Sequence, residues 1–293
     1  MKNREGVASG SATQILKYLT IKNHFSIKSC MKYRIICLSL LLCALFNHSA
    51  LAKGKVKKAP QKPKIIGVIG DYLANENNKH DYSSWPLHAM RYQYIDNLVQ
   101  ACEGENVAFV MLTNTSEQAD KVAKAVDAVV LTGGDDDPTG RRDRFEKAMV
   151  ERMLAQKKQI FGICRGMQMI NYFFGGEVIE MQPDQKKRHK SATYCRECNQ
   201  TKHRVILDEN SKLAKILGKT EINVNTNHNF AVRRMADNFI VTGRSPDDDI
   251  PEVMEMKNYP KFFLTVQWHP EFLSTEDDVK MLRAFCHAVA VNK

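Results

Sequence analysis

The sequence lacks a long apolar run, an internal repeat and a dense set of cysteines. Its longest apolar stretch, residues 35–46, is far shorter than the roughly 20 residues that a membrane-spanning helix needs. The missing repeat excludes a solenoid or a propeller. Only five of the eight cysteines lie beyond residue 52, and this odd number suits one free thiol. With 43% hydrophobic residues over 293 positions, the chain can bury a full core.

The positive charge of the chain is concentrated at its N-terminal end. The formal net charge of +10 invites comparison with nucleic-acid-binding proteins. The first 64 residues, however, hold 13 of the 43 Lys and Arg residues and one of the 33 acidic residues, which leaves residues 65–293 with a net charge of −2. A slightly acidic body argues against a basic binding surface, and we expect no nucleic-acid partner.

The basic leader has the pattern of an export signal. Beginning at Met31, a short basic segment with Lys32 and Arg34 precedes the apolar run, and Ala50-Leu51-Ala52 has the form of a cleavage site. We interpret residues 31–52 as a signal peptide, 53–64 as a basic linker and 1–30 as a non-native upstream extension. This predicts a periplasmic or secreted protein without stable membrane insertion after cleavage. An uncleaved membrane anchor is the alternative.

Residues 64–163 alternate between two patterns. Short apolar, β-branched runs predict strands, and segments with one apolar face predict helices; the strands are at 64–70, 107–112, 128–131 and 159–163, and the helices at 88–102, 117–125 and 143–156. This alternation is typical of an α/β fold with a mostly parallel central sheet flanked by helices. Active sites of such sheets lie at the carboxyl ends of the strands.

After residue 176 the pattern changes to short strands separated by turns. These strands are predicted at 178–181, 203–207, 221–224, 239–242, 253–256 and 262–266. We expect them to form a smaller mixed or antiparallel portion, packed at one side of the central sheet, followed by a closing helix over 276–291. Residues 65–293 are thus interpreted as a single domain.

A cysteine follows the last predicted parallel strand. Cys164 lies between Gly162 and Gly166, and the next helix is predicted to begin directly after it. A nucleophile on a sharp strand-to-helix turn needs such small neighbours. Unpaired N–H groups and the positive dipole end at a helix N-terminus favour a thiolate. The N–H of Arg165 is then a natural donor to an oxyanion.

A histidine and a carboxylate lie about a hundred residues further on. In Gln267-Trp268-His269-Pro270-Glu271, the imidazole and the carboxylate are two positions apart, and an extended chain would point both to the same side. The carboxylate of Glu271 can then hold the ring of His269 while the ring takes the thiol proton. Thiol, imidazole and carboxylate together predict an activated-nucleophile enzyme.

These motifs resemble the class I glutamine amidotransferase-like superfamily, a flavodoxin-like α/β fold. Within it, they are similar to the peptidase C26 branch, typified by γ-glutamyl-γ-aminobutyrate hydrolases. The resemblance runs over roughly residues 65–290 and rests on five ordered segments: Leu131-Thr132-Gly133-Gly134-Asp135, Arg142-Asp143 with Phe145-Glu146, Gly162-Ile163-Cys164-Arg165-Gly166-Met167-Gln168, Asn225-Thr226-Asn227-His228 and Gln267-Trp268-His269-Pro270-Glu271.

The resemblance implies a role for each of these positions. It places the catalytic triad on Cys164, His269 and Glu271, and the oxyanion hole on Gly133, Gly134 and Arg165. It implies substrate-binding positions at Gln168, Asn227 and His228, although His228 read alone could equally be a core histidine. No cofactor and no metal are expected.

The segment 184–203 departs from the family pattern because it is basic and contains Cys195-x-x-Cys198. The two cysteines could form a local disulfide, or could bind zinc together with His189 and His203, which bracket them at irregular spacing. We predict that Lys186-Lys187-Arg188 lies in a surface loop and that Asp247-Asp248-Asp249 forms a solvated turn.

The expected activity is cysteine-dependent hydrolysis of γ-glutamyl amide bonds through a thioester. Two alternatives stay open: a glutaminase that supplies ammonia to a synthase, and a non-catalytic binding protein on the same fold. The expected partner is a small γ-glutamyl molecule. The identity of the leaving amine and the oligomeric state, a homodimer included, are left open.

Overall fold

The computed structural model describes residues 61–73, 87–135, 137, 139–190 and 202–292. Contacts group Pro60–Lys293 into one compact unit. The predicted upstream extension, the signal peptide, most of the linker, and Cys195 with Cys198 lie outside the described residues. Among the described helices, none combines the length and the apolar character needed to cross a membrane.

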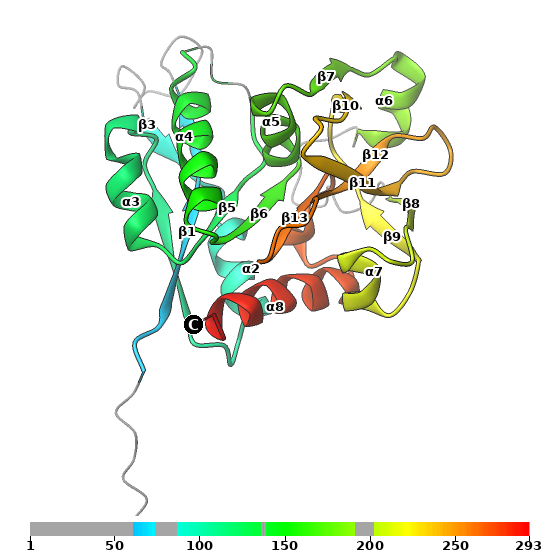
Figure 1. Ribbon diagram of the computed structural model, residues 1–293. Coiled ribbons are helices and arrows are strands. Elements are labelled where there is room, and N and C mark those ends of the chain that lie inside the picture. Colours follow the sequence, from blue (N-terminus) through cyan, green and yellow to red (C-terminus); the bar gives the residue numbers. More distant parts are fainter. Residues whose placement is uncertain (1–60, 74–86, 136, 138, 191–201, 293) are drawn as a thin grey trace, which may run out of the picture. The chain divides into compact units, whose positions relative to one another are not determined.

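A nine-stranded sheet runs through the unit in the order β4-β1-β5-β6-β13-β12-β11-β8-β9 (Figure 1). Its first part is parallel: β4 (Val107–Leu112), β1 (Lys64–Ile69), β5 (Ala128–Leu131), β6 (Gln159–Ile163) and β13 (Phe263–Val266). Every residue of β5 and β6 is buried, as expected for strands covered on both faces. The predicted α/β fold with a mostly parallel central sheet is confirmed.

The second part of the sheet is antiparallel. It contains β12 (Pro251–Met256), β11 (Phe239–Arg244), β8 (Lys202–Leu207) and β9 (Glu221–Asn225). The predicted mixed or antiparallel portion at one side of the central sheet is confirmed, and it continues the same sheet because β12 pairs directly with β13. Strand β13 is parallel to β6 on one side and antiparallel to β12 on the other, so it joins both parts into one sheet.

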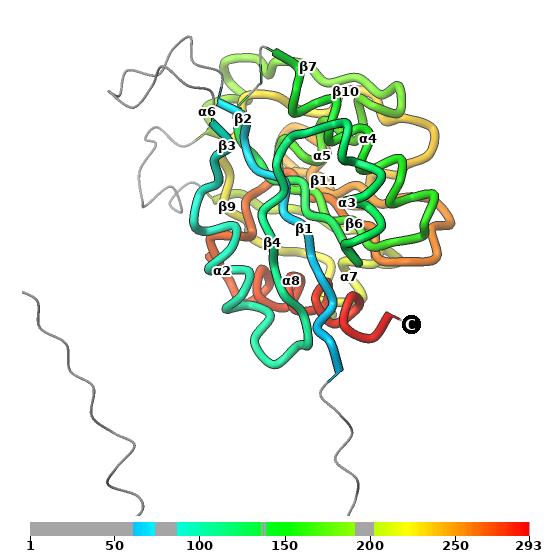
Figure 2. Tube along the Cα trace, turned by 90° about the vertical axis from the view of Figure 1, so that its left-hand side faces the viewer, coloured from blue at the N-terminus to red at the C-terminus, as the bar shows by residue number. Residues whose placement is uncertain are grey.

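Helices cover both faces of the sheet, and each face has its own core (Figures 1 and 2). One core contains side chains of α3 (Ala119–Ala125), α4 (Arg141–Ala155) and α5 (Arg165–Phe173). The other contains those of α2 (Gln93–Ala101), α7 (Lys212–Leu217) and α8 (Glu276–Ala290). Successive strand residues point to opposite faces, so Phe161 lies in the second core and Ile160 in the first.

Several local predictions need correction. The predicted helix at 88–102 begins later, because β3 (Leu87–Ala89) pairs with β2 (Asp71–Leu73) before α2 starts. A 3-10 turn, η3 (Ser116–Gln118), precedes α3. Strand β7 (Glu177–Glu180) pairs with an unpredicted strand, β10 (Phe230–Arg234). These pairings depend on distant residues, which periodicity does not report.

The basic loop predicted around Lys186 is a short helix, α6 (Pro183–His189). Its signals were present in the sequence: proline occupies the first helical turn, and Gln182 and Gln185 form a capping box. The side chain of the last residue, His189, is fully buried.

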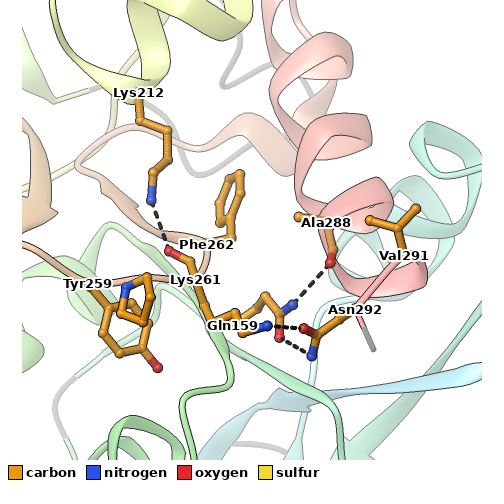
Figure 3. A pocket seen from close by; sticks show the side chains of 9 residues that line it. Gln159, Lys212, Tyr259, Lys261, Phe262, Ala288, Val291 and Asn292 are labelled. Atoms are coloured by element: carbon orange, nitrogen blue, oxygen red, sulfur yellow. Dashed lines mark hydrogen bonds between the residues drawn. The ribbon is translucent and has the colours of Figure 1, made fainter.

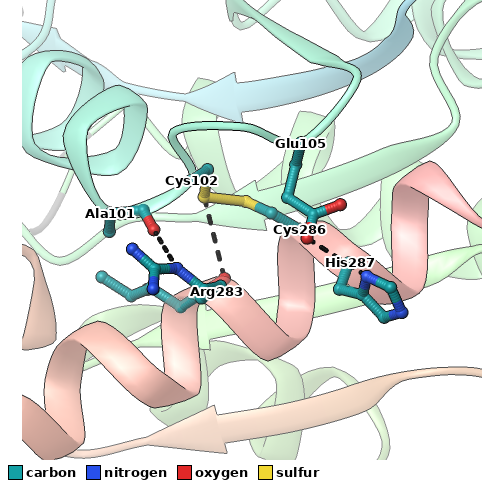
Figure 4. Close-up of a disulfide and its surroundings, with 7 residues drawn as sticks. Ala101, Cys102, Glu105, Arg283, Cys286 and His287 are labelled. Atoms are coloured by element: carbon teal, nitrogen blue, oxygen red, sulfur yellow. Dashed lines mark hydrogen bonds and ion pairs between the residues drawn. A yellow bond between two sulfur atoms is a disulfide. The ribbon is translucent and has the colours of Figure 1, made fainter.

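A disulfide between Cys102 and Cys286 ties the end of α2 to α8 (Figure 4). The two residues are 184 positions apart, their Cα atoms are 5.9 Å apart, and both are buried. Both cysteines were counted in the sequence but not paired, since spacing alone does not show which helices meet. Among the described cysteines, Cys164 is the one that is free.

We expect the double substitution Cys102→Ala/Cys286→Ala to lower the free energy of unfolding by roughly 2–5 kcal/mol, because the disulfide closes a very long loop. For a domain of this size, the melting temperature should fall by about 5–15 °C. Differential scanning calorimetry with and without reductant measures this. Cys164→Ser and Cys195→Ser/Cys198→Ser are the controls, and reductant should lower their melting temperatures as much as that of the wild type. A wild-type melting temperature that reductant leaves unchanged would contradict the Cys102–Cys286 disulfide.

Candidate active site

Cys164 occupies a sharp turn between β6 and α5. Its backbone has φ 50° and ψ −106°, a conformation that side chains other than glycine rarely adopt and that is common at functional sites. Its N–H donates to the carbonyl of Val266 at 2.8 Å, which ties the turn to the end of β13. The predicted nucleophile turn is therefore present, with Cys164 at the N-cap of α5.

His269 and Glu271 form a buried pair just after β13. Nδ1 of His269 lies 2.8 Å from Oε1 of Glu271, so Nδ1 carries the hydrogen. They begin a 3-10 turn, η4 (Pro270–Phe272), rather than the extended chain that we expected. Asn225 fixes the backbone here: its Nδ2 donates to the His269 carbonyl at 2.7 Å, and its Oδ1 accepts from the His269 N–H at 2.9 Å.

The imidazole and the thiol meet beside Gly133. A Cβ atom built on this glycine would lie 2.9 Å from Cε1 of His269 and 3.4 Å from Cβ of Cys164, so both side chains border the same point. Nε2 of His269 is buried and makes no hydrogen bond of good geometry to the described residues. It is the ring nitrogen that remains available for proton transfer, and such bonds often tighten only when substrate binds.

Charge sets the protonation of this ring. Burial alone would lower the pKa of His269, but the carboxylate of Glu271 and the neighbouring Cys164 raise it well above its usual range. The charged form of the ring is therefore favoured, with a carboxylate on one side and the thiol on the other. The structure brings the three predicted triad residues together.

The Gly-Gly loop offers one well-placed oxyanion donor. The N–H of Gly133 donates to the hydroxyl oxygen of Tyr94 at 3.0 Å, so this predicted donor is already engaged. The Gly133 carbonyl accepts from Arg142 at 3.2 Å, and a planar trans peptide sends the following N–H, that of Gly134, the opposite way. Gly134 lines the pocket together with Cys164 and Arg165. We therefore favour the N–H groups of Gly134 and Arg165 as the oxyanion donors.

Gly134 has no substitute at its position. Its φ of 134° disfavours other residues, and a Cβ would lie 2.0 Å from Oδ1 of Asp71.

Tyr94 is a site residue that lies outside the sequence motifs described above. It is almost fully buried on α2. Besides accepting from Gly133, its hydroxyl is close to Glu271; burial, with that carboxylate adding to it, raises the Tyr94 pKa well above its usual range. Tyr94 therefore links the loop to the triad carboxylate.

A buried ion-pair network connects the loop to the nucleophile turn. Glu146 on α4 accepts from Nε of Arg142 at 2.7 Å and from Nη1 of Arg165 at 2.7 Å. Arg142 also pairs with Asp71, and Arg165 with Asp143. Although burial opposes the charge, the two guanidinium groups lower the pKa of Glu146. Removing one partner of such a buried pair leaves an uncompensated charge, at a cost of about 3–5 kcal/mol.

A small pocket opens in front of the thiol. It has a volume of about 130 Å³ and is lined by Gly134, Asp135, Cys164, Arg165, Gln168, Asn227, His228, Asn229 and Phe230. The three predicted substrate-binding residues, Gln168, Asn227 and His228, are all in this lining. The side chain of Gln168 also supports the wall, since its Nε2 donates to the Phe230 carbonyl at 2.8 Å.

Gln267 is another residue in contact with the nucleophile. It is fully buried, and its Nε2 lies 3.6 Å from the sulfur of Cys164. Its Oε1 accepts from Gln168 at 3.2 Å. Gln267 was part of the terminal motif, but the sequence did not show that it faces the thiol.

A larger pocket, of about 590 Å³, lies at the other end of the strands, beside Gln159 (Figure 3). There Gln159 donates to the Ala288 carbonyl at 3.0 Å, and Lys212 donates to the Lys261 carbonyl at 3.2 Å. Gln159 begins β6 and Cys164 follows the end of β6, so the two pockets are separated by the length of the strand, about 16 Å. The larger pocket therefore does not reach the reacting atoms.

We expect Glu271→Gln to move the alkaline limb of the kcat/KM profile to lower pH. The substitution removes the charge that raises the His269 pKa, so the imidazolium loses its proton earlier as pH rises. At neutral pH, activity should fall by roughly 10²-fold or more. The matched control is Glu105→Gln, which changes a surface pair, Glu105 with His287 at 3.1 Å. An alkaline limb that stays in place in Glu271→Gln would refute this role.

Comparisons with known proteins agree with this geometry. A family model described as Peptidase C26 matches residues 64–271. The glutamine amidotransferase-like protein RP404 of Rickettsia prowazekii is 27% identical over 283 residues, covering 78% of this chain and 98% of that protein. The CTP synthase of Phytoplasma australiense is 31% identical, covering 72% of this chain and 40% of the synthase.

Solved structures share the fold. The glutaminase domain of Trypanosoma brucei CTPS with bound acivicin has a TM-score of 0.54 at 19% identity, covering 78% of this chain and 95% of that chain. A GMP synthase subunit protein from Thermoplasma acidophilum has the same TM-score of 0.54, also at 19% identity, covering 78% of this chain and 96% of that chain. The chain belongs to the Peptidase C26 family and is a glutamine amidotransferase-type hydrolase domain.

Proposed function

We propose that this protein hydrolyses γ-glutamyl amide bonds with Cys164 as the nucleophile. The observation that carries the proposal is the position of Cys164, at a strained turn facing a small polar pocket, with the buried His269–Glu271 pair beside it. Membership of the C26 family supports the choice of a γ-glutamyl group as the acyl part of the substrate.

The reaction has two halves. The sulfur of Cys164, whose proton is already held on Nε2 of the charged His269 ring, attacks the side-chain carbonyl of the γ-glutamyl group. The N–H groups of Gly134 and Arg165 stabilise the oxyanion. When the C–N bond breaks, His269 returns the proton to the leaving amine and a thioester remains. Water then attacks the thioester with His269 as the base, releasing glutamate and restoring the thiol.

The size and lining of the pocket suit this substrate. A pocket of about 130 Å³ suits a short polar group better than a bulky ligand. Asp135, Asn227 and Asn229 are polar residues of its lining. A carboxylate such as Asp135 can bind the α-ammonium of a glutamyl group. The leaving amine would then project from the pocket, where fewer contacts constrain it.

The decisive experiment measures amine release from a panel of γ-glutamyl amides, with free L-glutamine included. We expect turnover of γ-glutamyl amides and peptides, and a loss of roughly 10³-fold or more in Cys164→Ala. Cys102→Ala/Cys286→Ala is the matched control, because it removes two cysteines away from the pocket, together with their disulfide, and should keep its turnover at temperatures below its melting point.

The panel also separates the alternatives. Hydrolysis of glutamine alone, with release of ammonia, would support the glutaminase. Mass spectrometry with a glutamine-analogue electrophile tests the remaining alternative, since a binding protein without turnover would leave Cys164 unmodified. Equal activity in wild type and Cys164→Ala would overturn the proposed mechanism.

Export is part of the same proposal. The Cys102–Cys286 disulfide supports it, because structural disulfides persist in oxidising compartments and are rare in the cytosol. In a bacterial host, we expect the exported protein to begin near Lys53, after the cleavage site. N-terminal sequencing of the periplasmic fraction measures this. Met31→Ala should abolish production if translation starts there, whereas a product that begins at Met1 and retains residues 31–52 would contradict the signal-peptide interpretation.

A further inference from the structure

A second group of buried histidines lies behind the pocket wall. His189 at the end of α6, His203 on β8 and His228 before β10 surround Glu252 on β12. The side chain of Glu252 is fully buried, and none of the three histidine side chains is more than 7% exposed. The rings of His203 and His228 lie 4.6 and 4.9 Å from that of His189. The triad and its contacts do not explain this group.

The outer nitrogen of each ring is fixed by an acceptor. Nε2 of His189 lies 3.0 Å from a carboxylate oxygen of Asp248. Nδ1 of His203 lies 2.9 Å from the carbonyl oxygen of Arg204, and Nδ1 of His228 lies 2.9 Å from that of Phe230. Because these oxygens only accept, each of these nitrogens carries a hydrogen. In a neutral ring, the other nitrogen then has a free lone pair.

The three free nitrogens point at one oxygen. Oε1 of Glu252 lies 3.4 Å from Nδ1 of His189, 3.5 Å from Nε2 of His203 and 3.7 Å from Nε2 of His228. Within the described residues, none of these three nitrogens and neither oxygen of Glu252 has a hydrogen-bond partner. Four acceptor groups thus face one another in a buried space, an arrangement that is costly unless a cation lies between them.

We propose that this group binds a divalent transition metal ion, with zinc as the best match. His189 Nδ1, His203 Nε2 and a carboxylate oxygen of Glu252, all within 4.8 Å of one another, are three ligands. Nε2 of His228, which lies 3.7 Å from Oε1 of Glu252, is the candidate for a fourth ligand after a small shift of its ring. For bonds of about 2.0–2.2 Å, the edge of a tetrahedron of ligand atoms is about 3.3–3.6 Å. Of the three distances to Oε1 of Glu252, those of 3.4 and 3.5 Å lie within this range and that of 3.7 Å needs a small contraction.

The surroundings match those of known metal sites. Metal-binding histidines usually donate their other N–H to a carboxylate or a backbone carbonyl, as all three rings do here. Asp248, which we expected in a solvated turn, instead points inward, and its side chain is only 7% exposed. A surface pocket of about 390 Å³ is lined by His189 and His203 and provides an entry path.

A proton in place of the metal explains the geometry less well. Burial raises the pKa of Glu252 to about 7, so a neutral carboxyl is accessible. One proton, however, satisfies a single pair of acceptors and leaves the other nitrogens unpaired. The distances of 3.4–3.7 Å are also longer than those of hydrogen bonds.

The ligand set differs from the one considered from sequence. In the sequence analysis, His189 and His203 were considered as zinc ligands together with Cys195 and Cys198, which lie outside the described residues. The preferred expectation was that the protein binds no metal. In the structure, Glu252 on β12 contributes instead, and His228, in the segment before β10, lies beside it.

The ion would fix one wall of the catalytic pocket. The Phe230 carbonyl accepts both from Nδ1 of His228 and from Nε2 of Gln168, at 2.9 and 2.8 Å. A metal on Nε2 of His228 therefore holds the 227–230 segment in place through that ring. This role is structural: the ion lies behind His228, and the proposed chemistry at Cys164 does not pass through it.

The test uses protein without a histidine tag, loaded with zinc and then dialysed. Inductively coupled plasma mass spectrometry should find about one zinc ion per chain, and a chelator should lower the melting temperature by several degrees. Glu252→Gln and His203→Ala should lose most of the metal. His287→Ala, which changes a surface histidine, should retain it, as should Cys164→Ala.

Two further measurements keep the test decisive if a variant folds poorly. Cobalt-loaded wild type should show the visible absorption of tetrahedral Co²⁺ with nitrogen and oxygen ligands, without thiolate charge-transfer bands. Cys195→Ser/Cys198→Ser should leave both the spectrum and the zinc content unchanged. Absence of bound zinc in folded wild type, or loss of zinc in the double cysteine variant, would overturn the site. These measurements need no substrate, so they are independent of the proposed γ-glutamyl activity.

Discussion

The active site depends on one buried carboxylate that is shared by two arginines. Glu146 is inaccessible to solvent and binds both Arg142 and Arg165. Arg142 holds the carbonyls of Thr132 and Gly133, which orients the Gly-Gly loop. Arg165 is the first residue of α5, directly after the nucleophile. The ion pairs therefore set the distance between the oxyanion donors and the sulfur. Removing these charges from water costs much of the free energy that the ion pairs gain. We therefore infer that the ion pairs position the site more than they stabilise the fold.

The sheet supplies the second constraint. Strands β6 and β13 are parallel neighbours, with Ile163 opposite Val266. Cys164 follows one strand and the 267–271 motif follows the other, so adjacent parallel strands deliver the nucleophile and the base to the same edge. The Cys164 N–H bonded to the Val266 carbonyl continues this register past the end of β6. Residues about a hundred positions apart in sequence thus meet without any long loop having to fold over the site.

The sequence predicted the parts of this site that have local signatures. The strand at 159–163, with Gly162 near its end and Gly166 after it, indicated the nucleophile turn, and this strand was predicted with its observed bounds. Contacts made by single side chains at long range were not predictable. Tyr94 has the pattern of an ordinary buried helix residue, and nothing local shows that its hydroxyl reaches Gly133. Cys102 and Cys286 pair because α2 and α8 pack together, which is a property of the fold.

For the same reason, the sequence predicted only part of the histidine group behind the pocket. His189 and His203 bracket an unusual segment and were noticed as a pair, but their carboxylate comes from β12, in the antiparallel part of the sheet. Strand β12 pairs with β13, and His269 follows β13. In the 225–230 segment, Asn225 donates a hydrogen bond to the His269 carbonyl, and His228 faces Glu252. One stretch of backbone thus contacts both clusters. A change that displaces the 225–230 segment would therefore disturb both the backbone of His269 and the histidine group. The antiparallel part of the sheet thus contributes to the active site as well as to the fold.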